Sequence, residues 1–214
     1  MPDPDRRPHA DRSARPVPRI GVFGGTFDPP HVGHLVAAIN VRHALSLTSV
    51  ILMVANIPWQ KIDQRRITPS GDRLAMVAAA VRTVDGLEAG DLEIRAGGHS
   101  YTADTLAELG RRHPEAELFT IVGDDAAAGF TTWERAEEVA ARSTLVVVDR
   151  PGVAVDLPPV PGGATWLRVE VPHLEVSSTD LRARFVDGRP LDYLVTDPVL
   201  AVIAERGLYA EAGS

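Results

Sequence analysis

Short apolar runs alternate along the chain with longer segments whose apolar residues recur at helical spacing. The short runs have the length of buried strands and predict strands at 19–23, 49–54, 92–95, 118–122, 145–149 and 166–171. The longer segments predict helices at 35–45, 70–81, 102–112, 132–142, 177–187 and 197–206. This alternation predicts an α/β fold, a doubly wound parallel sheet with helices on both faces.

The chain has 214 residues, enough for one domain with a substantial core. Residues 1–18 hold five prolines and many charges, so we expect a disordered tail there. We expect a single domain at 19–210, including a small C-terminal helical part, followed by a second tail at 211–214. Ligands of parallel α/β sheets bind beyond the carboxyl ends of the strands, so functional residues are expected in the loops that follow strands.

Composition narrows the function classes. The formal net charge of −7 argues against non-specific nucleic-acid binding, which needs clustered Lys and Arg. The absence of cysteine excludes disulfides, thiolate metal sites and cysteine nucleophiles. No apolar run reaches the length of a membrane span, and no apolar signal segment opens the chain. We therefore expect a soluble, cytoplasmic protein with no nucleic-acid or membrane partner.

Residues 21–35 read as the end of a strand, a tight glycine turn and the start of a helix. A helix start offers backbone N–H groups and partial positive charge, and a phosphate can approach Gly24 and Gly25 closely because they lack Cβ atoms. His31 and His34, three residues apart, share one face of the helix. The spacing fits neither the GxGxxG fingerprint nor a Walker A loop. Two surface histidines, or a metal pair without an obvious third ligand, are the simpler alternatives.

A second polar helix start lies at Ser177-Ser178-Thr179-Asp180-Leu181-Arg182. Ser and Thr in this place are commonly no more than helix caps. Here hydroxyls, N–H groups and a guanidinium one turn into the helix come together, which suits a polyphosphate.

These two stretches carry a family resemblance. GGTFDPPHVGHL resembles the HxGH motif of the nucleotidyltransferase superfamily of adenylyltransferases, and VSSTDLR resembles its ISSTxxR motif, with Val176 in place of Ile. The most similar members are bacterial nicotinate-mononucleotide adenylyltransferases, which implies a Rossmann-like fold. The resemblance implies His34 as principal transition-state donor, assisted by His31 and Arg182. It implies that ATP and its phosphates contact Gly24, Gly25, Thr26, Phe27, Lys61, Gly123, Asp125, Ser178, Thr179 and Arg182.

Two further segments resemble acceptor-binding parts of the family. Ser100–Leu106 resembles the SYTxDTL segment, which implies that Thr102, with Tyr101 beside it, receives the nicotinate carboxylate at a helix start. Thr132-Trp133 resembles a TW pair whose Trp stacks on the pyridine ring. A plain helix cap at Thr102 and a core role for Trp133 are the alternatives.

The chain's only lysine, Lys61, follows Trp59-Gln60, where the family loop commonly reads PPHK. The resemblance implies that Lys61 approaches the phosphates as a point charge, and a solvated lysine is the alternative.

The implied reaction is adenylyl transfer from ATP to nicotinate mononucleotide, giving deamido-NAD and pyrophosphate, in NAD biosynthesis. Mg²⁺ is expected to bridge the phosphates with few protein ligands, and no metal site made by the protein alone is expected. Nicotinamide mononucleotide and pantetheine phosphate are alternative acceptors, and a non-catalytic nucleotide sensor is an alternative of another class. A homo-oligomer is possible.

Overall fold

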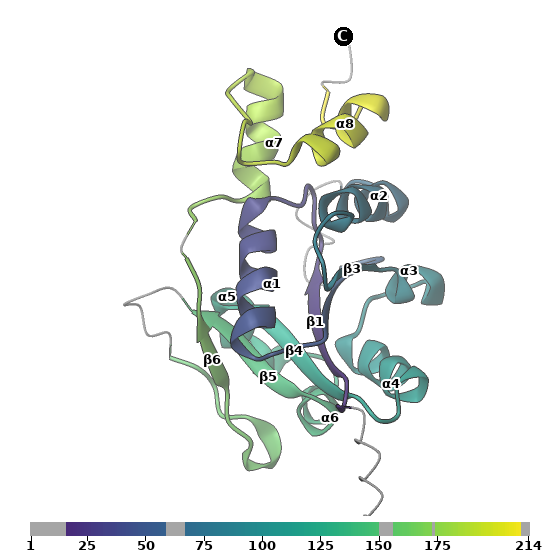
Figure 1. The fold of residues 1–214 in the computed structure, drawn as a ribbon, viewed down its shortest axis with the longest axis vertical. Coiled ribbons are helices and arrows are strands. Elements are labelled where there is room, and N and C mark those ends of the chain that lie inside the picture. The colour runs from purple at the N-terminus through teal and green to yellow at the C-terminus, as the bar shows by residue number, and fades with distance from the viewer. Residues whose placement is uncertain (1–15, 59–66, 150–155, 173, 211–214) are drawn as a thin grey trace, which may run out of the picture.

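The computed structural model describes residues 16–58, 67–149, 156–172 and 174–210. Its centre is a six-stranded sheet in which every neighbouring pair is parallel and the order is β3-β2-β1-β4-β5-β6 (Figure 1). The strands are β1 Arg19–Gly25, β2 Ser49–Val54, β3 Leu87–Gly90, β4 Glu117–Gly123, β5 Thr144–Asp149 and β6 Leu167–Glu170. This order is that of a Rossmann-like fold, and the predicted doubly wound α/β class is confirmed.

Helices connect and cover the strands. They are α1 Val32–Ala44, α2 Ser70–Val81, α3 Leu92–Ala96, α4 Thr102–Arg112, α5 Asp124–Ala128, α6 Ala136–Arg142, α7 Ser178–Asp187 and α8 Asp197–Glu205, with 3-10 turns η2 Phe130–Thr132 and η3 Pro161–Gly163. One apolar core joins the sheet to α1, α2, α7 and α8, and another joins its other face to α4 and α6. No helix within the described ranges is both long and apolar enough to cross a membrane.

The central strand β1 shows how the sequence separates these two faces. Ile20 and Val22 belong to the core on the α4 side. On the other face, a Cβ on Gly21 would lie 2.8 Å from the Ile121 side chain and 2.9 Å from that of Leu47. Gly21 therefore lets neighbouring side chains fill the space beside β1 under α1.

Two sequence predictions were wrong. The strand expected at 92–95 is the short helix α3, which Gly97 ends with a φ of 72°, and the strand of this region is β3, just before it. As an edge strand β3 buries only Leu87 and Gly90, so no apolar run marks it. The helix expected from 132 begins at Ala136, because Trp133 is extended and Arg135 is left-handed with a φ of 55°.

The C-terminal helices lie against the start of α1 and along α2 (Figure 1). The Val32 N–H donates to the Leu194 carbonyl at 3.0 Å, and Arg206 pairs with Asp72 at 2.6 Å. The C-terminal part therefore reaches the same end of the sheet as the glycine turn. Residues 1–15 and 211–214 of the expected tails lie outside the described residues.

Candidate active site

Two adjoining hollows lie beyond the carboxyl ends of β1 and β4, where the strand order reverses. The larger, of about 660 Å³, contains the two histidines and the polar start of α7. The smaller, of about 210 Å³, contains Trp133 and the start of α4. Both are lined by Gly24, Gly25, Thr26 and Gly123, so a molecule in one hollow can meet a molecule in the other across the glycine turn.

The two imidazoles lie one above the other at the start of α1. Their ring centroids are 3.7 Å apart, with an angle of 24° between the planes. The backbone N–H of His31 donates to Nδ1 of His34 at 3.2 Å. Because Nδ1 accepts, the proton of a neutral His34 lies on Nε2, which can donate to a ligand in the larger hollow.

His31 is only 8% exposed, and burial lowers its pKa from 6.5 to about 4. At neutral pH His31 is therefore uncharged. Its Nδ1 is buried and has no hydrogen-bond partner among the described residues. A Cβ on Gly33 would lie 3.0 Å from Val176 and 3.1 Å from the His31 ring. The lack of a side chain at Gly33, between the two histidines, therefore leaves room for the His31 ring.

The sequence predicted a tight turn at Gly24 and Gly25, but both end strand β1 and pair with Met53 and Val54 of β2. The two glycines differ in what they make room for. Gly24 faces open space, as expected for a backbone that a phosphate approaches. A Cβ on Gly25 would instead lie 2.7 Å from the Phe27 ring, which is buried and stands edge-on to His34 at a centroid distance of 4.9 Å. Gly25 therefore leaves room for the Phe27 ring, and that ring positions His34 from its buried side. Both residues also line the hollow.

The start of α7 is held directly against the histidine loop. Ser178 Oγ donates to the Pro29 carbonyl at 2.9 Å, and Arg182 donates to the Asp28 carbonyl at 2.7 Å. The other guanidinium nitrogen of Arg182 donates to Thr179 Oγ1 at 3.0 Å. The two motifs, about 150 residues apart, thus form one wall of one cleft. Ser177 is a plain cap, since its hydroxyl accepts the Asp180 N–H.

The expectation that α1 offers free N–H groups needs correction. The His31 N–H is bound to His34, the Val32 N–H to Leu194 and the His34 N–H to the His31 carbonyl. These three donors are satisfied within the protein and are not offered to an anion, whereas the imidazoles and the Arg182 guanidinium line the hollow beside them.

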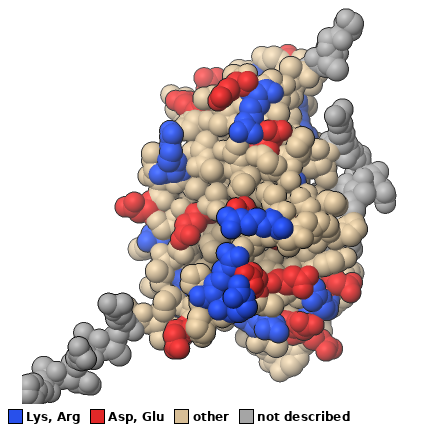
Figure 2. All heavy atoms as spheres, turned by 90° about the vertical axis from the view of Figure 1, so that its right-hand side faces the viewer, with Lys and Arg blue, Asp and Glu red and all other residues tan. Residues whose placement is uncertain are grey.

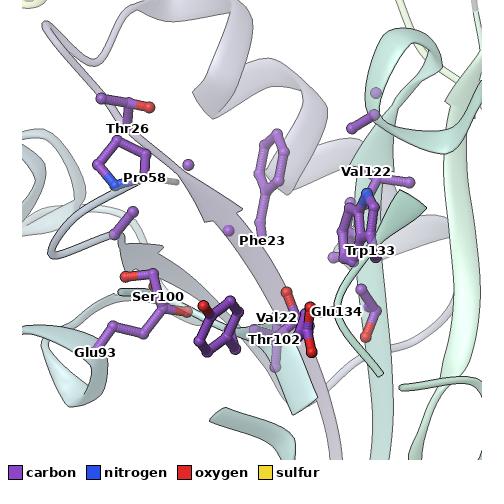
Figure 3. A pocket seen from close by; sticks show the side chains of 18 residues that line it. Val22, Phe23, Thr26, Pro58, Glu93, Ser100, Thr102, Val122, Trp133 and Glu134 are labelled. Carbon is purple, nitrogen blue, oxygen red and sulfur yellow. The ribbon is translucent and has the colours of Figure 1, made fainter. Parts of the chain in front are cut away.

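The smaller hollow has an aromatic side and a polar side (Figure 3). Trp133 lies across the hollow from Pro58 and Ser100, with Phe23 above the space between them (Figure 3). The extended backbone at Trp133, which delays the start of the predicted helix to Ala136, is what turns Trp133 toward this space. Its indole Nε1 is buried without a partner among the described residues.

Tyr101 and Thr102 begin α4 at the edge of this hollow, as the sequence indicated. Tyr101 is the cap residue, and the Arg135 guanidinium lies over its ring at 5.8 Å. Gly123 lines both hollows and Asp125, on α5, lines the larger one. Lys61, with Trp59 and Gln60, lies outside the described residues.

Sequence reasoning missed a buried arginine that ties the two hollows together. Arg73 is 1% exposed and donates to three carbonyls, of Thr26 and Thr68 at 2.8 Å and of Asn56 at 2.9 Å. It fixes the ends of β1 and β2 relative to each other. A signal was present, because Arg73 stands one turn before Met76 and Val77 on the apolar face of its helix.

Asn56 extends this hydrogen-bond network to the loop just before α4. Its N–H donates to Ser100 Oγ at 2.8 Å and its amide donates to the Gly98 carbonyl at 2.9 Å. Glu93, on the wall of the smaller hollow, accepts from Thr105 at 2.8 Å and also from Ser100. Burial raises the pKa of Glu93, against the opposing effect of the hydrogen bonds from Ser100 and Thr105.

Comparison with known proteins agrees with this geometry. A family model described as Cytidylyltransferase-like matches residues 22–184. A Corynebacterium kroppenstedtii protein described as "Probable nicotinate-nucleotide adenylyltransferase" is 43% identical over 197 residues, covering 92% of this chain and 93% of that protein. A protein of the same description from Exiguobacterium sibiricum is 41% identical, with coverages of 90% and 99%.

Among solved structures, the fold is shared with Plasmodium falciparum nicotinic acid mononucleotide adenylyltransferase complexed with NaAD. The TM-score is 0.72 at 16% identity, over 90% of this chain and 97% of the other.

Proposed function

Since the chain belongs to the cytidylyltransferase-like family, we propose that it transfers the adenylyl group of ATP to nicotinate mononucleotide, giving nicotinate adenine dinucleotide and pyrophosphate in NAD biosynthesis. The observation that carries the proposal is the meeting of two motifs on one cleft. His31 and His34 face the same hollow as Ser178, Thr179 and Arg182. A triphosphate can touch both groups at once, as transfer at the α-phosphorus with departure of pyrophosphate requires.

In this reaction a phosphate oxygen of the acceptor attacks the α-phosphorus. A new P–O bond forms, the bond from the α-phosphorus to the bridging oxygen breaks, and the electron pair leaves with pyrophosphate. The attacking phosphate is already ionised at pH 7, so no general base is needed. The protein contributes by positioning and by stabilising charge.

His34 is the proposed donor to the reacting phosphoryl group. Its Nε2 carries the proton because Nδ1 is occupied by the His31 N–H. His31, kept neutral by burial, assists as a hydrogen-bonding group rather than as a cation. The positive charge at this end of the hollow comes from Arg182, which with the Ser178 and Thr179 hydroxyls would hold the leaving pyrophosphate.

The smaller hollow is proposed to receive the pyridine end of the acceptor. The flat face of Trp133 suits a heteroaromatic ring, and the start of α4 at Thr102 suits a carboxylate. These features support nicotinate mononucleotide over pantetheine phosphate, which has no aromatic ring to stack.

Mg²⁺ is proposed to accompany ATP. The described residues contain no cluster of three or more His, Cys, Asp or Glu side chains able to hold a metal ion alone. Asp124 and Asp125 line the larger hollow and supply hard oxygen donors, which fits an ion held chiefly by phosphates and water. When bound, the ion would neutralise charge on the triphosphate, while Arg182 and the hydroxyls orient it.

The proposed partners are therefore two small molecules. On the face that carries α2, α3 and α4, acidic and basic side chains are interspersed, as in the Arg95–Asp91 and Arg111–Glu108 pairs (Figure 2). On the face shown, that mixture differs from the clustered Lys and Arg that non-specific nucleic-acid binding needs. A cytoplasmic location and a homo-oligomer remain predictions.

The decisive experiment is pyrophosphate release with ATP and Mg²⁺ against nicotinate mononucleotide, nicotinamide mononucleotide and pantetheine phosphate. We expect the first to give the highest kcat/KM. Trp133→Ala should raise the KM of the pyridine acceptor while the KM for ATP changes little. Release with pantetheine phosphate alone would transfer the proposal to that acceptor, and ATP binding without release from any acceptor would favour a nucleotide sensor.

A further inference from the structure

A buried hydrogen bond joins the C-terminal end of the described chain to the loop before the histidines. The Tyr209 hydroxyl donates to Asp28 Oδ1 at 2.7 Å, across 181 positions of sequence. Asp28 is 1% exposed, and its other carboxylate oxygen accepts the Thr68 N–H at 3.4 Å. Tyr209 lines neither of the two hollows.

Asp28 is where this bond meets the phosphate-binding groups. Its backbone carbonyl accepts Arg182 at 2.7 Å, and the next carbonyl, of Pro29, accepts Ser178 at 2.9 Å. The side chain of Asp28 therefore accepts a hydrogen bond from the Tyr209 phenol, while its backbone carbonyl accepts one from the Arg182 guanidinium. A shift of Asp28 would move Arg182 relative to the cleft.

Tyr209 is itself firmly placed. Its ring packs against Phe185 of α7, with centroids 5.2 Å apart. Burial and the Asp28 carboxylate both raise the pKa of the phenol, so it stays a protonated donor throughout the physiological range. The Val32 N–H donates to the Leu194 carbonyl, so the C-terminal part holds the loop at Asp28 and at Val32, on both sides of His31.

We propose that Tyr209 is a positioning residue for the proposed adenylyl transfer, holding Asp28 so that Arg182 points at the departing pyrophosphate. The inference rests on the proposed function and adds a residue to its machinery. Without the hydroxyl, a buried carboxylate oxygen loses a close donor, and the Asp28 loop relaxes to find another. The relaxation would displace the groups that hold the triphosphate, but would leave the Trp133 hollow unchanged.

The test is Tyr209→Phe, which removes one oxygen and leaves the ring against Phe185. Tyr193→Phe is the matched control, because Tyr193 is 93% exposed. We expect Tyr209→Phe to lower kcat/KM for ATP by about tenfold or more, the scale of a small misplacement of reacting groups, with the acceptor KM within about twofold of wild type. Tyr193→Phe should match wild type in every constant.

If the hydroxyl were merely structural, Tyr209→Phe would lower the melting temperature but leave kcat and the KM for ATP unchanged at temperatures where the variant is folded. Unchanged ATP constants, a Tyr209→Phe protein that does not fold, or a KM for the acceptor that rises as much as the KM for ATP would each overturn the proposal. In an Arg182→Lys background we expect Tyr209→Phe to lower kcat/KM for ATP by much less than tenfold, because both substitutions disturb the same contact. Full additivity would also overturn it.

ATP-induced shifts in melting temperature separate this proposal from the proposed function. If the wild-type protein binds ATP and releases no pyrophosphate with any acceptor, the proposed function fails. The ATP-induced shift of Tyr209→Phe, expected to be smaller than that of wild type at equal ATP concentration, still tests whether the hydroxyl positions the ATP site.

Discussion

At the scale of single residues, the stacked histidines have different tasks despite their similar surroundings. Nδ1 of His34 accepts a backbone N–H, which leaves the proton of the neutral ring on Nε2. His31 is deeper and is uncharged at neutral pH. His34 therefore offers the phosphoryl group a directed N–H donor, and the His31 ring stacked against it is neutral. The pair does not supply two positive charges.

Replacing His34 tests the donor. We expect His34→Ala to lower kcat by about 100-fold or more, the loss found when one preorganised donor to a reacting centre is removed. Circular dichroism should show an unchanged fold, since His34 is only half-buried and its ring contacts among the described residues are with Phe23, Phe27 and His31. Steady-state pyrophosphate release measures the effect, and a kcat close to wild type would assign the donor role elsewhere.

Burial of neutral His31 also predicts how stability varies with pH. Its pKa is about 4 when folded and about 6.5 when unfolded, so between these values the unfolded chain binds a proton that the folded one does not. This contribution to stability is complete above about pH 6.5 and is lost as the pH falls toward 4. Denaturant unfolding at pH 7 and pH 4.5 should show a loss about 2 kcal/mol larger for wild type than for His31→Gln. Equal losses would mean that His31 gains its proton easily in the folded protein.

At the scale of elements, the sequence predicts long, strongly patterned segments well and short ones poorly. Strand β5 and helix α4 have the apolar patterns expected of their burial, and both lie where they were predicted. Strand β3 was missed because an edge strand of four residues needs no apolar run. The start of α6 was misplaced because a left-handed Arg135 has no residue-type signature such as glycine.

The loops between elements depend on Arg73, which gives an element-scale prediction. Arg73→Met keeps most of the volume but leaves the carbonyls of Thr26, Asn56 and Thr68 without this donor. We expect a loss of about 2–5 kcal/mol in the free energy of unfolding, the scale for removing one partner of a buried charged network. Arg206→Met, which breaks a half-exposed ion pair, should cost less than about 1 kcal/mol. Denaturant titration compares the two, and similar losses would contradict a special role for Arg73.

At the scale of the whole molecule, the site exists because segments far apart in sequence meet at one end of the sheet. The identities of His31, His34, Arg182 and Trp133 as candidates could be predicted from motifs. Their arrangement could not, because it depends on long-range contacts such as that of Ser178 with Pro29. The bond between Tyr209 and Asp28 could not be predicted either, since a lone tyrosine after a helix has no pattern to mark its partner.

That arrangement predicts which parts of the molecule each substrate orders. ATP alone should slow amide hydrogen exchange in both 24–35 and 177–185, because a triphosphate in the larger hollow touches the turn and α7 together. Nicotinate mononucleotide alone should slow exchange in 101–105 and 130–134, around the smaller hollow. The 3-10 turn Pro161–Gly163, which lines neither hollow, serves as the internal reference. Mass-spectrometric exchange at matched saturation measures all three regions. ATP protection confined to the glycine turn would mean that α7 does not hold the triphosphate, and the leaving-group role of Arg182 would have to be withdrawn.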